Sequence, residues 1–183
     1  DEAMISAARG YPRSASFASG RLVFCDLPEI PNGIAVSSAR GIQDFGVGLD
    51  DDDAIARQVG PESERLLHAI DAGDLLLFST SNSYFVNIRN NGLLTPSNFA
   101  PVLFDRRGAS SIRPVFVGNG VVFVESNGEA ISAAVLDGNI YLNWSVRPLT
   151  DMHSQLIKSP VDLCGPSLTS EQPEKYVLVI NSD

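Results

Sequence analysis

Four consecutive aspartates, Asp50, Asp51, Asp52 and Asp53, form the most concentrated group of ionisable side chains in the sequence. Carboxylates can bind Ca²⁺, but calcium loops place their oxygens at alternate positions around a central glycine, and this run has neither feature. A solvated acidic turn that caps the following segment is the simpler interpretation. The run is therefore the one candidate cation site, and we predict neither a bound metal nor a cofactor.

The two histidines, His68 and His153, do not form a recognisable zinc or catalytic motif. A zinc site needs three or four His, Cys or carboxylate ligands, and neither a C-x-x-C nor an H-E-x-x-H motif is present. His153 lies beside Asp151 and Ser154, the residue types of a hydrolase triad, but the sequence has no G-x-S-x-G elbow. We predict no catalytic residues and a protein that is not an enzyme.

The single tryptophan, Trp144, follows Tyr141 and Leu142 in a stretch with apolar residues at alternate positions. This pattern is typical of a strand with a half-buried aromatic residue, whereas an exposed Trp144 would be an anchor for a binding partner. The glycines Gly118 and Gly120 are expected in a tight hairpin, because no phosphate-binding G-x-x-x-x-G-K-[ST] motif follows a strand.

A turn followed by an apolar strand occurs three times in the chain. In the first copy, Ser19 and Gly20 supply the positive φ that a hairpin requires, and the aliphatic and aromatic residues of 21–24 suit a buried strand. Similar stretches surround Gly73 and Gly118 to Gly120. These glycines, the expected structural turns, lie about 50 residues apart, the spacing of a β-repeat.

Each copy is followed by another short apolar run, which gives three or four strands per unit. We therefore expect a mainly β fold of repeated antiparallel hairpin or meander units, partly propeller-like, with few short helices, at 62–69 and 151–157. Propeller blades, kelch-like arrays and stacked β-modules all fit this pattern. One such unit cannot bury its own apolar face, so its neighbours must cover it. The expected units of this single β-repeat domain are 10–60, 61–108, 109–165 and the start of another at 166–183.

Composition limits the classes of function. The chain of 183 residues is 44% apolar, which excludes a disordered protein, and its net charge of −9 disfavours binding to a phosphate backbone. No apolar run is long enough to span a membrane. Cys25 and Cys164 are expected to be reduced thiols, although one disulfide is conceivable. We also expect the chain to be a piece of a longer protein.

A series of short motifs runs along the chain: Arg9 to Ser14, Phe17, Gly20 to Phe24, Pro31 to Gly33, Ser37, Asp44-Phe45, Asp51 to Ile55, Gly73 to Phe78, Leu94 to Asn98, Gly108 to Ser110, Ile112 to Val115 and Tyr176 to Asn181. In the same order, these motifs resemble large virion proteins of tailed bacteriophages, of the tail-tube or nozzle type. The resemblance covers most of the chain and is more specific as an ordered series than in any one motif. In place of a basic stretch expected in this family, the chain has Glu125-Ser126-Asn127-Gly128-Glu129.

The resemblance implies that the chain is a structural component of a phage or prophage tail and acts through oligomeric assembly. It implies no catalytic residue. The expected location of the chain is the virion, after synthesis in the host bacterial cytoplasm. Expected partners are other copies of the chain and other tail proteins, with DNA passing through the assembly without specific recognition. The alternatives are a β-module that binds carbohydrate or a host receptor through exposed aromatic residues such as Trp144, Tyr84 or Tyr141, and a tail-associated glycan hydrolase that uses paired acids.

Overall fold

The structure is a computed structural model that describes residues 5–7, 9–90, 92–138, 143–152, 154–165 and 176–182. Within these ranges the fold is mainly β, with 14 antiparallel strands in four small sheets and one 3₁₀ helix, η1 (Ser154–Leu156). The described strands close neither a barrel nor a propeller. No helix in these ranges has the length and apolar character needed to cross a membrane.

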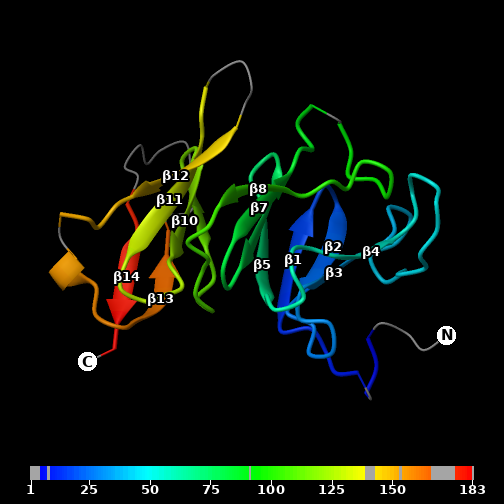
Figure 1. Ribbon diagram of the computed structural model, residues 1–183. Coiled ribbons are helices and arrows are strands. Elements are labelled where there is room, and N and C mark those ends of the chain that lie inside the picture. The colour runs from blue at the N-terminus through cyan, green and yellow to red at the C-terminus, as the bar shows by residue number, and fades with distance from the viewer. Residues whose placement is uncertain are drawn as a thin grey trace. The chain divides into compact units, whose positions relative to one another are not determined.

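Three of the sheets are four-stranded meanders in which each strand pairs with the next along the chain (Figure 1). The first sheet contains β1 (Ser14–Ala18), β2 (Arg21–Cys25), β3 (Gly33–Val36) and β4 (Ile55–Gln58). The second contains β5 (Leu66–Asp71), β6 (Leu75–Ser79), β7 (Ser83–Val86) and β8 (Val102–Asp105). The third contains β9 (Val115–Val117), β10 (Gly120–Val124), β11 (Ile131–Leu136) and β12 (Trp144–Pro148). The fourth sheet pairs β13 (Pro160–Cys164) with β14 (Leu178–Asn181).

The sheets can be compared directly with the repeat units expected from the sequence. The first, second and third sheets lie within 10–60, 61–108 and 109–165, respectively. β13 also lies within 109–165, but it pairs with β14 and so belongs to the fourth sheet. By its internal contacts the chain divides into two compact units, unit 1 (1–80 and 84–103) and unit 2 (81–83 and 104–183), and the boundary passes through β7 and β8.

Two tight turns join the opening strands of the first and third sheets. Ser19 (φ 51°) and Gly20 (φ 75°) both have positive φ, the pattern of the type I′ turn that matches the twist of a hairpin. Gly118 (φ 63°) occupies the first position of the two-residue β9–β10 turn, where type II′ turns place glycine. In the second sheet, Gly73 (φ 86°) lies in the loop between β5 and β6.

Gly120 has a different role from the turn expected for it. It is the first residue of β10, is paired with Val117, and does not have positive φ. A Cβ atom at this position would lie 2.8 Å from the Ala134 carbonyl oxygen on β11. Glycine is therefore needed here because two backbones approach closely, and not because of its conformational freedom.

The helix expected at 62–69 is wrong, because Leu66–Asp71 form β5. Leu66 and Leu67 are both buried, so this segment has apolar surroundings on both of its faces. Pairing with β6 supplies its backbone hydrogen bonds, whereas an eight-residue helix is only marginally stable without extensive packing. In the second stretch expected to be helical, 151–157, the structure has the 3₁₀ helix η1.

In each unit two sheets share one apolar core. In unit 1, Val23 and Val36 of the first sheet belong to the same buried cluster as Leu75 and Leu77 of the second. In unit 2, side chains of β10 and β11 pack with the inner side of the fourth sheet, where Leu163 is buried. Each large aliphatic side chain that is fully buried contributes roughly 1.5–3 kcal/mol, so these cores dominate the stability of the units.

Replacement of Gly73 by Val is expected to lower the free energy of unfolding by about 1–3 kcal/mol or more, because a β-branched residue is strained at positive φ. A Cβ atom there would also lie 2.5 Å from the Arg89 Nη2 atom. Gly20→Val is the matched control, since a Cβ at Gly20 meets no atom within 4 Å and only the backbone strain remains. Urea unfolding should show the larger loss for Gly73→Val; equal losses would contradict the packing contribution.

Candidate functional site

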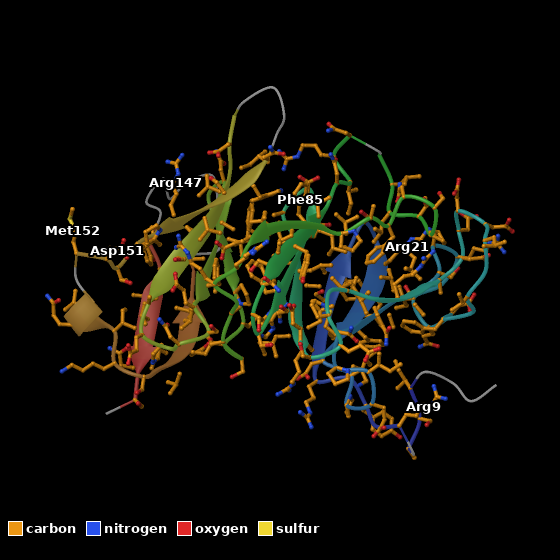
Figure 2. All side chains as sticks on the ribbon, in the orientation of Figure 1. Arg9, Arg21, Phe85, Arg147, Asp151 and Met152 are labelled. Atoms are coloured by element: carbon orange, nitrogen blue, oxygen red, sulfur yellow. The ribbon has the colours of Figure 1, made fainter. Side chains whose placement is uncertain are left out.

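The acidic run lies in the long loop that joins β3 to β4 and is fixed by a buried arginine. Arg21, on β2, is only 4% exposed. Its Nη1 donates to the Asp53 carbonyl oxygen at 2.7 Å, and its Nη2 donates to the Asp51 carbonyl oxygen at 2.6 Å. Nη1 also lies 3.4 Å from the carbonyl oxygen of Ser37, where the loop begins. Figure 2 shows Arg21 beside this loop. The guanidinium thus joins both ends of the loop.

The charge of Arg21 is compensated by the same loop. Burial lowers the pKa of Arg21, since a charged guanidinium loses water, and the nearby carboxylates of Asp52, Asp51 and Asp53 act in the opposite direction. Asp51, Asp52 and Asp53 therefore stabilise a buried cation that was not evident from the sequence. The only sequence signal for it is a single charged residue, Arg21, at the start of an otherwise apolar strand.

Three carboxylates of the acidic run, those of Asp51, Asp52 and Asp53, accept hydrogen bonds from groups of the protein itself. Asp53 Oδ2 accepts a hydrogen bond from the Asp50 N–H at 3.0 Å. Asp52 Oδ2 accepts one from Arg40 Nε at 3.4 Å, and Asp51 Oδ1 accepts one from the Ser97 hydroxyl at 3.3 Å. Across the described ranges, no group of three or more His, Cys, Asp or Glu side chains is arranged to hold a metal ion.

The rest of the loop is ordered by its own backbone and by an aromatic contact. Backbone N–H groups of Ser38 and Ala39 donate to the carbonyl oxygens of Asp44 (2.7 Å) and Asp52 (2.9 Å). The ring of Phe45 stacks on Phe24 of β2, with centroids 5.3 Å apart and an interplanar angle of 19°. This long connection is thus a structured part of unit 1.

Glu64 is a buried carboxylate that the sequence did not single out. The hydroxyls of Ser79 (2.6 Å) and Tyr84 (3.2 Å) both donate to Glu64 Oε2. Tyr84, one of the aromatic residues considered for glycan binding, is therefore buried and directed into the protein. A buried carboxylate needs such donors, and this one links three segments of unit 1.

Two other buried carboxylates also bind groups of unit 1. Asp74 Oδ1 accepts hydrogen bonds from the backbone N–H groups of Ile88 (3.1 Å) and Arg89 (3.0 Å). Asp26 accepts two hydrogen bonds from Arg65 Nη2, at 2.8 and 3.0 Å. These hydrogen bonds indicate that Asp74 and Asp26 have structural roles at strand ends and loops, and not the roles of a catalytic pair of acids.

Trp144 and His68, both singled out in the sequence, have separate surroundings. Trp144 is 4% exposed at the start of β12, so its ring is not presented to solvent. His68 Nδ1 lies 3.5 Å from the Ser14 hydroxyl in unit 1. His153 and Tyr141 lie outside the described residues.

The two cysteines are free thiols in different surroundings. Cys25 is buried in the core of unit 1, and burial together with the charge of Asp26 raises the pKa of its thiol far above the ordinary value. Cys164, on β13, is exposed.

An open cleft of about 730 Å³ occurs in unit 2, between the loops 110–112, 127–129 and 155–160. Its lining is formed mainly by neutral polar side chains together with Ile112 and Ile157, and its charged lining residues are Glu129 and Lys158. Glycoside hydrolysis uses two carboxyl groups on either side of the scissile bond, and the described lining of this cleft supplies one.

No protein-family model matches the sequence, and no curated protein matches it significantly.

Replacement of Arg21 by Met should lower the free energy of unfolding by about 2–4 kcal/mol, because the carbonyl groups of Asp51 and Asp53 lose a charged donor. The matched control is Asp51→Asn, Asp52→Asn, Asp53→Asn, which keeps these carbonyl groups and should preserve the fold with a smaller loss. Urea unfolding measures both. A larger loss in the triple variant, or a melting temperature of the unsubstituted protein that falls with chelator, would contradict this account of the loop.

The two thiols should react at very different rates. A native sample treated with Ellman's reagent at pH 8 should release one equivalent of thiolate quickly, from Cys164, and a second only after denaturation. The raised pKa of Cys25 keeps its thiol protonated, and its burial excludes the reagent. Cys164→Ser should remove the fast phase; a fast phase that survives this substitution would show that Cys25 is accessible.

Proposed function

We propose that this chain is a structural component of the tail of a phage or prophage, similar to tail-tube or nozzle proteins, whose work is done by interfaces rather than by catalysis. The observation that carries the proposal is the succession of four-stranded meanders with apolar residues on both faces, including faces exposed at the surface. Such units are stable when neighbouring units cover them.

The order of motifs along the chain supports the same proposal. Several motifs that resemble tail proteins coincide with the elements on which the fold depends, including the turn at Gly20, the acidic loop at Asp51–Asp53, and the loop at Gly73. In this proposal the sheets are blades of a partly propeller-like module, and the virion is the place where the protein acts after synthesis in the host cytoplasm.

The net charge of −9 suits a component of a channel through which DNA passes. A surface with excess negative charge repels the phosphate backbone, so DNA slides without being held. The proposed partners are accordingly other copies of the chain and other tail proteins, without specific nucleic-acid recognition.

The alternative of a glycan-binding module depended on exposed aromatic rings. Of the aromatic residues considered for this role, Trp144 and Tyr84 are both buried, and Tyr141 lies outside the described residues. The alternative of a glycan hydrolase depended on paired acids, and the buried carboxylates of Glu64 and Asp74 accept hydrogen bonds from the protein's own groups. We therefore retain the assembly role.

Immunogold electron microscopy of particles from a lysogen that encodes this chain provides the test. Antibody raised against residues 1–183 should label the tail, and deletion of the coding segment should leave heads without complete tails. An isogenic strain that encodes the Leu49→Glu protein controls for the genetic manipulation itself, since the side chain of this loop residue is exposed. Complete, unlabelled and infectious particles in the deletion strain would overturn the proposal.

A further inference from the structure

The first sheet has a second apolar face, which solvent reaches. Strand alternation places Ala15 and Phe17 of β1 on the same face as their partners Phe24 and Leu22 of β2. Phe17 is 60% exposed, and Leu22 and Phe24 are partly exposed. Antiparallel sheets usually have a polar outer face. We call Ala15, Phe17, Leu22, Phe24 and the stacked Phe45 the aromatic face.

The fourth sheet has a similar exposed face formed by aliphatic residues. Its inner side, with Leu163 and Val179, packs in the core of unit 2. Its outer side carries Leu178 and Ile180, which are 58% and 50% exposed, together with their cross-strand partners Cys164 and Asp162, which are also exposed. Val161, in the irregular start of β13, is exposed as well. We call Val161, Leu178 and Ile180 the aliphatic face.

Sheets pack in one direction along the chain in both units. The first residue after the hairpin turn is Arg21 in the first sheet and Gly120 in the third. In the first sheet, the face with Arg21 also carries Val23 and packs on the second sheet. In the third sheet, the face with Gly120 also carries Val122 and packs on the fourth sheet. The aromatic face is the opposite side of the first sheet, where a preceding sheet would pack. The aliphatic face is where a following sheet would pack.

The charges beside the two faces are complementary. Arg13, immediately before β1, is exposed and makes no ion pair among the described residues. Asp162 of β13 is paired with Ile180 across the fourth sheet, so its exposed carboxylate lies on the same side, among the residues of the aliphatic face. Its Oδ1 accepts only the N–H of Leu163 among the described residues, so its carboxylate is available to a cation.

We propose that the aromatic face of one copy of this chain binds the aliphatic face of a second copy, so that copies associate head to tail. This inference rests on the proposed function, because it assigns the surfaces through which the chain assembles. The pairing repeats between copies the sheet-on-sheet packing that occurs once within each unit. Strand alternation places Arg13 on the same side as Ala15 and Phe17, so in this pairing it would face Asp162 of the second copy. Each added copy leaves one face of each kind open, so the association either closes into a ring or extends.

Complementation between two variants tests the pairing. Phe17→Glu places a carboxylate on the aromatic face, where it meets Asp162 of the second copy, and Ile180→Lys places a cation on the aliphatic face, where it meets Arg13. Sedimentation velocity should show concentration-dependent association of the unsubstituted chain and at least about tenfold weaker association of each variant alone. An equimolar mixture of the variants keeps one intact face on each, so association should be restored through 1:1 pairing of these two intact faces.

Leu49→Glu in unit 1 and Met152→Lys in unit 2 are matched controls, since both replace exposed apolar residues outside the two faces. Both should associate like the unsubstituted chain, and circular dichroism with urea unfolding should show all variants folded. Either face variant forming dimers alone would overturn the pairing in favour of like faces. An unsubstituted chain that stays monomeric at millimolar concentration would overturn it as well.

These outcomes are separate from those that test the tail assignment. Association through other surfaces would overturn the pairing of the two faces and leave a role in the tail intact. Conversely, the two variants could associate with each other while electron microscopy shows that virions lack the chain. This combination would support the pairing and reject the tail assignment.

Discussion

The structure depends on one constraint, which is that its sheets are apolar on both faces. A four-stranded meander with water on one side usually alternates apolar and polar residues. β6 departs from this rule, because Leu75, Leu76, Leu77 and Phe78 are all buried. A strand with these side chains is stable only between two other layers. The packing of two sheets within each unit follows from this requirement.

Arg21 provides the main polar exception within these sheets. It occupies the first position of β2, on the face that otherwise carries Val23 and Cys25, and its guanidinium lies beneath the β3–β4 loop. Backbone carbonyl groups receive its hydrogen bonds, and the aspartates of the loop offset the cost of removing its charge from water. An acidic run that looks like a ligand-binding motif therefore serves to bury one cation. The loop is fixed as a consequence.

Much of the architecture could be predicted from the sequence, because turns and strand periodicity are local signals. The Ser19-Gly20 turn and the positive φ of Gly73 follow from the conformations that these residues allow. The segment 62–69 was wrongly expected to be helical, since its apolar residues fit both periods and only the pairing with β6 decides between them. Gly120 closes the expected β9–β10 hairpin, but the need for glycine there could not be predicted: a Cβ would meet Ala134 on a neighbouring strand, which no local pattern reveals.

The site residues could be predicted less well, because their roles depend on contacts between distant segments. Burial of Trp144, the partners of Glu64 and the position of Arg21 under the acidic loop each join residues far apart in the sequence. The order of residues identified the acidic run but not Arg21, the buried cation beside it. The spacing of glycines predicted repeated units, whereas the pairing of β13 with β14 had to come from the three-dimensional arrangement.

The irregular start of β13 has a consequence for how polypeptide can be added to the fourth sheet. Pro160 has no N–H to donate, and the register shifts between Pro160 and Asp162, which bends the strand. A chain approaching this margin finds an interrupted ladder, whereas β14 offers an unbroken run of four residues. Lateral extension of the sheet is thus directed to one side, and the other is protected against the uncontrolled edge-to-edge stacking that leads to fibrils.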